Sequence, residues 1–119
     1  MSPVKHPVSG PTLTFSLVRE MEALRGELTK APARAAKTLI KEGPITVTLI
    51  GVKAGGGLNA HKAAGPITLQ VLEGEIEFKV GETSRTLPLG TLFALDGGIV
   101  HEVLSEHGGI FLLTVVSHA

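Results

Sequence analysis

From residue 34 onward the chain consists of short apolar segments separated by turn-forming residues, about every 6–10 residues. About eight of these segments have the β-branched or alternating composition of strands. The segment 75–80 is the clearest, because Ile76, Phe78 and Val80 alternate with charged residues. No helical pattern interrupts the series, so parallel β–α–β units are not expected. The sequence therefore predicts an all-β domain of the sandwich, jelly-roll or barrel type.

The predicted strands and turns can be placed along the chain. The strands are 35–41, 45–52, 67–72, 75–80, 83–87, 91–95, 101–104 and 110–116. The turns that separate them carry glycine or proline, and they fall at 42–44, 73–74, 81–82, 88–90, 96–98 and 108–109. The run Gly55–Gly57 lacks the lysine and the helix that a phosphate-binding loop requires, so it predicts a flexible turn at the rim of the domain.

The N-terminal part has a different pattern, with three prolines that indicate an extended arm and then a helix of about three turns. Apolar residues recur there at helical spacing: Leu17, Val18, Met21, Leu24 and Leu28. Thr14 or Ser16 can cap this helix, and Pro32 must end it. Its apolar stripe needs a partner, either the outer face of a sheet or a second subunit. We therefore divide the chain into an arm and helix, 1–33, and a β-domain, 34–117.

The composition excludes several classes of partner. The 119 residues include 11 basic and 11 acidic ones, so no net charge attracts nucleic acid or an anionic membrane. Four phenylalanines are the only aromatic residues, which disfavours stacking on single-stranded nucleic acid. The absence of cysteine excludes disulfides and thiolate metal sites. No secretory-type segment and no apolar stretch of ~20 residues is present, so we expect a soluble cytoplasmic protein without a membrane partner.

Two motifs with glycine and histidine at fixed spacing span the predicted strands and the turns between them. The first runs from Gly55 through His61 to Gly74, and the second runs from Gly90 to His101. Gly55, Gly74 and Gly90 each stand at a predicted turn, where glycine allows a positive φ or a close approach of two backbones. Two motifs in this order, on a β-rich background, constrain the fold more than either would alone.

The order and spacing of these motifs resemble the two signature motifs of the cupin family, over roughly residues 34–117. The stretch Val71–Glu75 is the one most typical of that family. The resemblance implies a double-stranded β-helix, which is a jelly-roll barrel of cupin type, here with a short N-terminal helix. Because cupins commonly pair, it also implies a homodimer in which the N-terminal segment packs on the barrel or on the partner.

In metal-binding cupins the first motif supplies two histidines and a carboxylate, and the second motif supplies a third histidine. His61 and His101 stand at two of these positions here, whereas Ala63 and Ile67 stand at the other two. Structural zinc sites take four protein ligands and catalytic ones three. Two imidazoles therefore predict at most a weakly held divalent metal ion. None of the other residues considered is a convincing third ligand: Glu73, Glu75, Glu102 and His118.

Strand alternation predicts which side chains surround the two histidines. A ligand pocket is expected from one face of the strands and from the second motif: His61, Ala63, Ile67, Leu69, Val71 and His101. The two histidines would then face each other across the opening of the barrel. The alternative is that both are inherited from the fold and only bond to backbone or water.

Three hypotheses about function remain open. The first, which we favour, is a binding or sensor module that holds a small molecule with help from the two histidines. The second is a metal-dependent enzyme of the isomerase or dioxygenase kind, an activity that the fold alone cannot establish. The third is a structural or interaction protein whose barrel is filled by its own side chains. The sequence names no substrate and no catalytic residue.

Overall fold

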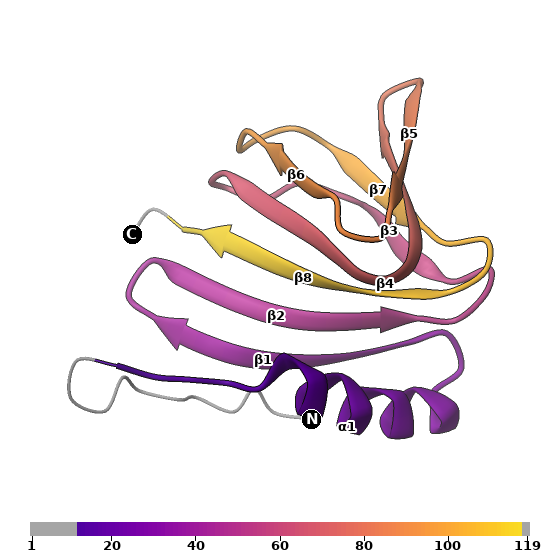
Figure 1. Cartoon of the computed structure of the whole chain (residues 1–119). Coiled ribbons are helices and arrows are strands. Elements are labelled where there is room, and N and C mark those ends of the chain that lie inside the picture. The colour runs from indigo at the N-terminus through magenta and orange to yellow at the C-terminus, as the bar shows by residue number, and fades with distance from the viewer. Residues whose placement is uncertain (1–11, 118–119) are drawn as a thin grey trace.

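The computed structural model describes residues 12–117, in which one helix is followed by eight strands (Figure 1). The arm predicted for the first residues lies mostly outside this range. The elements are α1 (Leu17–Lys30), β1 (Arg34–Glu42), β2 (Ile45–Val52), β3 (Gly57–His61), β4 (Ile67–Val80), β5 (Thr83–Pro88), β6 (Leu92–Leu95), β7 (His101–Leu104) and β8 (Gly109–Val116).

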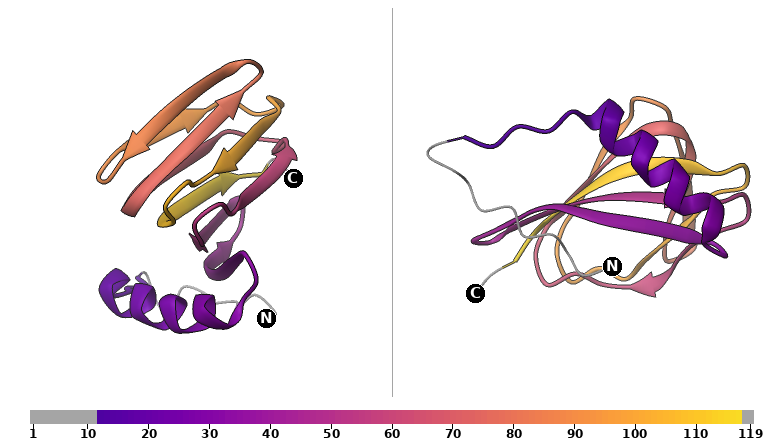
Figure 2. Two further views of the ribbon diagram at one scale, coloured as in Figure 1. Left: turned by 90° about the vertical axis from the view of Figure 1, so that its right-hand side faces the viewer. Right: turned by 90° about the horizontal axis from the view of Figure 1, so that it is seen from below.

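The long strand β4 joins two antiparallel sheets. Its first half pairs with β6 and β8, and its second half pairs with β5 and β7. The first sheet continues from β8 to β2 and β1, and the second continues from β7 to β3. Figures 1 and 2 show the strands curling around a shared interior, with the helix outside. The predicted all-β jelly-roll barrel with one short helix is confirmed.

The turn predicted at Glu73–Gly74 is wrong, because β4 runs through it without a break. The register against β8 shifts between Val71 and Glu73, and Gly74 has φ +70. A Cβ added at Gly74 would meet the carbonyl oxygen of Gly108 at 2.3 Å. This glycine therefore bends the strand from one sheet into the other instead of reversing the chain.

The strand β3 was not predicted, since a flexible turn was expected at Gly55–Gly57. The structure keeps a turn before Gly56, but Gly57 already belongs to β3. A Cβ at Gly57 would lie 2.0 Å from the carbonyl oxygen of Val103 on β7. Glycine is required at this close approach of two backbones, and the strand forms through its pairing with β7 instead of through a local apolar pattern.

An inner core fills the space between the two sheets. It contains residues from five strands: Ile50, Val52, Ile67, Leu69, Val71, Ile76, Phe78, Leu87, Val103 and Phe111. Each of them is less than a tenth exposed. Ala63 and Phe93 are among the partly buried residues that pack against this core. The interior of the barrel is therefore occupied largely by its own side chains.

An outer core lies on the other face of the first sheet, under α1. Its buried members come from the helix and three strands: Leu24, Leu39, Leu49 and Ile110. Ser16 is the N-cap and accepts a hydrogen bond from the amide of Arg19. Val18 was expected in the apolar stripe but is 69% exposed, because it faces away from the sheet. The partner of the stripe is thus the sheet of the same chain.

Two ion pairs join the helix to the sheet. The Arg25 guanidinium donates to the Glu73 carboxylate of β4, with its Nε 3.1 Å from Oε1, and Lys37 of β1 contacts Glu20. The hydrogen bond with Glu73 raises the pKa of Arg25 above its ordinary value. Both side chains of this first pair are 44% exposed, so the pair orients the helix more than it stabilises the fold.

Candidate functional site

His61 and His101 lie side by side at the end of the barrel where β3 finishes and β7 begins, here called the mouth. The two residues face each other directly in the register of these strands. Their ring centroids are 4.3 Å apart, with 62° between the ring planes. His61 is exposed, whereas His101 is only 4% exposed. One ring therefore faces solvent and the other forms the floor beneath it.

Both rings are held by the same local hydrogen bond. The Nδ1 of His61 lies 2.8 Å from the carbonyl oxygen of Asn59, and the Nδ1 of His101 lies 3.0 Å from that of Ile99. A carbonyl oxygen only accepts, so each neutral ring carries its proton on Nδ1. Within residues 12–117 neither Nε2 has a hydrogen-bond partner. Each neutral ring therefore keeps an Nε2 lone pair that no described residue engages.

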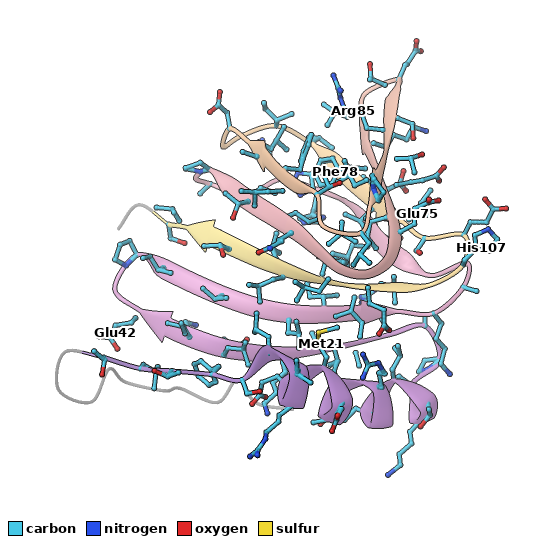
Figure 3. The ribbon with its side chains drawn as sticks, viewed as in Figure 1. Met21, Glu42, Glu75, Phe78, Arg85 and His107 are labelled. Atoms are coloured by element: carbon cyan, nitrogen blue, oxygen red, sulfur yellow. The ribbon has the colours of Figure 1, made fainter. Side chains whose placement is uncertain are left out.

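A phenylalanine below the pair fixes the buried ring. Phe78 stacks on His101 with a centroid separation of 5.2 Å and an angle of 15°, and it also contacts Phe93 at 4.6 Å. Figure 3 shows Phe78 inside the curl of the strands. The alternating pattern of β4 had placed Phe78 on an apolar face. Its contact with His101 was missed because β4 and β7, although paired in the sheet, are far apart in the sequence.

The other residues predicted for the ligand pocket belong to the inner core. Ile67, Leu69 and Val71 are 3% exposed or less, and Ala63 packs against them. Their inward orientation agrees with the strand alternation, but side chains from other strands surround them. Of the six predicted pocket residues, the two histidines are in ring contact at the mouth, where His61 is exposed and His101 is buried beneath it.

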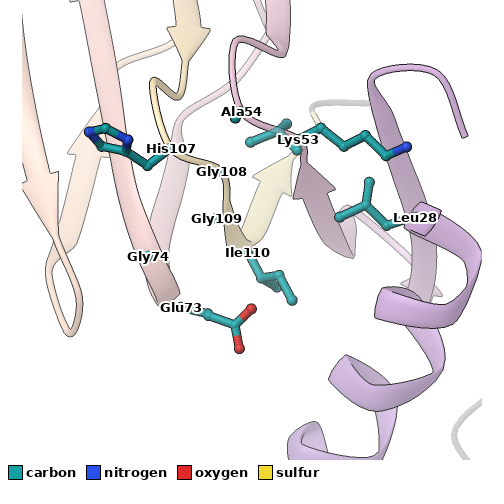
Figure 4. Close-up of a pocket in the computed structure, with 10 residues that line it drawn as sticks. Leu28, Lys53, Ala54, Glu73, Gly74, His107, Gly108, Gly109 and Ile110 are labelled. Atoms are coloured by element: carbon teal, nitrogen blue, oxygen red, sulfur yellow. The ribbon is translucent and has the colours of Figure 1, made fainter.

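Clefts on the outside of the molecule are separate from the interior. One of about 220 Å³ adjoins His101 and is bordered by Lys79 and Glu102. Another, of about 690 Å³, lies at the opposite end, between α1 and the β7–β8 turn. Figure 4 shows its lining, with Leu28 on the helix side and His107 on the far side. The histidine pair is outside this larger cleft.

The residues at the mouth do not fit a complete metal centre. No group of three or more histidine, cysteine, aspartate or glutamate side chains that could hold a metal ion occurs in the described part of the chain. Glu73 is engaged by Arg25, and Glu102 follows His101 on β7 and therefore points to the other face. His118 lies outside the described residues. Within those residues no helix is long and apolar enough to cross a membrane.

No protein-family profile matches this sequence, and no curated protein matches it.

Solved structures are similar to the chain in fold. A conserved protein of unknown function from Streptococcus pyogenes has a TM-score of 0.72 and 18% identity, over 100% of this chain and 97% of that one. A cupin superfamily protein from Desulfitobacterium hafniense has a TM-score of 0.70 and 11% identity, over 73% and 80%. An RmlC-like cupin from Desulfovibrio desulfuricans has a TM-score of 0.65 and 23% identity, over 71% and 82%. The chain therefore has the double-stranded β-helix fold of the cupins, as its two motifs predicted.

Proposed function

We propose that this chain is a small-molecule-binding or sensor module whose ligand binds at the mouth of the barrel, to Nε2 of His61 and His101. The observation that carries this proposal is the matched geometry of the two rings. Each is fixed through Nδ1 by a backbone carbonyl, and each leaves Nε2 without a partner from the described residues. Two oriented acceptors side by side suit a small molecule that donates hydrogen bonds.

The binding position we propose is the surface of the mouth and not the interior. The inner core occupies the space below the pair, and Phe78 lies directly against His101. A ligand that entered further would have to displace packed side chains, which is costly in a close-packed interior. This site would contact one face of a ligand and leave the other face in water.

The filled interior also favours a second candidate function. The ten buried residues of the inner core are what a barrel with a purely structural or interaction role would contain. In that case the histidines would cap the core and bind nothing. The two candidates differ in one measurable property, which is whether Nε2 of either ring responds to an added small molecule.

A metal-dependent enzyme is the weakest of the three hypotheses. A divalent ion held by His61 and His101 alone would complete its coordination with water and would exchange readily. Such an ion would need both rings neutral, so its binding would weaken at acidic pH. We propose no catalytic step, because a backbone carbonyl and not a carboxylate orients each ring.

Nitrogen NMR of the histidine side chains tests this proposal on the full chain without an affinity tag. We expect Nδ1-protonated rings for His61 and His101, and we expect some members of a library of hydroxyl-bearing and amide-bearing fragments to shift their Nε2 signals. These shifts should vanish in His61→Ala and persist in His107→Ala. His107 is the matched control, because its exposed ring lies at the other end of β7.

Zinc chloride added to the same samples separates the alternatives. Weak, saturable shifts of both Nε2 signals would support a loosely held ion. Stoichiometric metal in protein purified without a chelator would instead favour the enzyme hypothesis. If neither fragments nor zinc moves the two signals, the binding function is wrong and the structural role is the better one.

A further inference from the structure

The short strand β6 is an edge of the first sheet. Among the strands of residues 12–117 it pairs with β4 alone. The amide of Val71 donates to the carbonyl of Thr91, and this bond determines which residues of β6 direct their backbone groups toward β4. In an antiparallel ladder only alternate residues bond to a given neighbour. Phe93 and Leu95 therefore bond to β4, whereas Leu92 and Ala94 direct their N–H and C=O groups away from it.

These edge groups have no backbone partner in the described part of the chain. Unpaired N–H and C=O groups on an edge strand are a template for another strand, and proteins usually protect them with charges, proline or a bulge. The other edge of the same sheet, β1, has such protection, since it carries Lys37 and Lys41 and a register shift after Thr38. In contrast, β6 has no charged side chain and no register shift.

The side chains around this edge are apolar and exposed. No charged residue occurs from Thr86 to Leu95. Leu89 is 65% exposed and Leu92 is 66% exposed, which are high values for leucine. A cleft of about 390 Å³ opens beside the small side chain of Ala94, with Thr68, Ile99 and one charged residue, Asp96, on its walls. Leu92, a large exposed side chain, thus lies two residues before Ala94, a small side chain with a cleft beside it.

We propose that this edge binds a second copy of the chain through antiparallel pairing of the two β6 strands. A two-fold axis at Phe93 places Leu92 opposite the partner's Ala94, and the same contact occurs again on the other side of the axis. Leu92 and the partner's Ala94 then exchange both of their backbone hydrogen bonds. The Leu92 side chain comes to lie beside the cleft next to the partner's Ala94.

A copy of the same chain suits this surface better than a charged partner does. The strand β6 itself carries no charged side chain, so it is compatible with a copy of itself, whereas it offers no complementary charge to a basic or acidic strand. The two-fold arrangement closes at two copies, because it uses both β6 edges and leaves none free. The helical stripe, from which a homodimer was expected, already packs on its own sheet. This inference does not depend on ligand binding at the histidine pair.

Sedimentation of the full chain over a wide range of concentration tests the proposal. The mass should rise from 12.4 kDa toward twice that value, reversibly, because four-residue strands bury a small interface. Leu92→Lys should weaken association about tenfold or more, because the two-fold axis introduces the charge twice. Val18→Lys is the matched control, since Val18 is an equally exposed apolar residue on α1, and it should associate like wild type.

Amide hydrogen exchange on the wild-type chain gives a readout that needs no variant. The amides of Leu92 and Ala94 should exchange more slowly as the concentration rises, while that of Phe93, which bonds to β4, serves as the internal reference. A chain that stays monomeric at the highest concentration would overturn the proposal. So would association that Leu92→Lys leaves unchanged or that Val18→Lys weakens equally. Circular dichroism confirms that both variants are folded.

Discussion

The first sheet has a hydrophobic core on each face, and the two cores are built differently. The inner core draws on strands from both sheets and includes two fully buried phenylalanines, Phe78 and Phe111. The outer core joins one helix to the same sheet through four buried aliphatic residues. Ion pairs at the edge of the helix, such as Arg25 with Glu73, are partly exposed to solvent.

Because of this difference, we expect the barrel and the helix α1 to differ in stability. The inner core depends on long-range strand pairing, so losing it means unfolding the whole domain. The helix is connected in sequence to β1 through the short segment 31–33 and contacts one sheet alone, so we expect it to detach while the strands remain paired. The histidine pair rests on the inner core through Phe78. The site should therefore be as rigid as the barrel and independent of the helix.

Removing Phe78 should have the largest effect on stability. Phe78→Ala leaves a cavity in the inner core, and such changes cost about 3–5 kcal/mol. The free energy of unfolding can be followed in urea by circular dichroism, since tryptophan and tyrosine are absent. Leu89→Ala is the control, because that side chain is 65% exposed and its loss should change stability by less than about 0.5 kcal/mol. Similar losses in both variants would contradict the picture of a packed interior.

Truncating Leu24 should cost less and should act on the helix. Leu24 is 1% exposed in the outer core, and its Cδ2 lies 3.2 Å from where a Cβ would stand on Gly51. Leu24→Ala should lower stability by about 2 kcal/mol, the low end for a buried leucine, because the helix can detach before the barrel unfolds. Amides of α1 should exchange faster while those of β4 and β8 stay protected. Faster exchange in every strand would mean that the two cores unfold together.

The sequence predicted best those features that a local pattern determines. The alternation of Ile76, Phe78 and Val80 placed them on one face, and the first two of these are now buried in the inner core. The spacing of the helical stripe identified α1 correctly, although Val18 at its edge faces solvent. In both cases each residue's environment follows from its neighbours within a few positions.

Features that depend on distant pairing were predicted poorly. Gly74 has the local signature of a turn, but the bend it makes within β4 is set by the backbone of Gly108 in the β7–β8 turn. The strand β3 has no apolar alternation and exists because β7 lies beside it. The motif spacing did place His61 and His101 at one end of the barrel. The carbonyls that fix both rings are backbone groups, for which the sequence has no signal.

The smallest effect on stability is expected for His61, and that small effect is informative. Its ring is exposed, and its Nδ1 donates a hydrogen bond to a carbonyl in its own strand. His61→Ala should therefore change the free energy of unfolding by less than about 0.5 kcal/mol. His101→Ala should cost more, because that ring is buried against Phe78. Urea titrations of the two variants compare them directly. A loss above about 1 kcal/mol for His61→Ala would show that this ring supports the fold. If the free energy of unfolding is unchanged, the oriented Nε2 of His61 has no structural role. That is the result expected for a group at the mouth that binds a ligand.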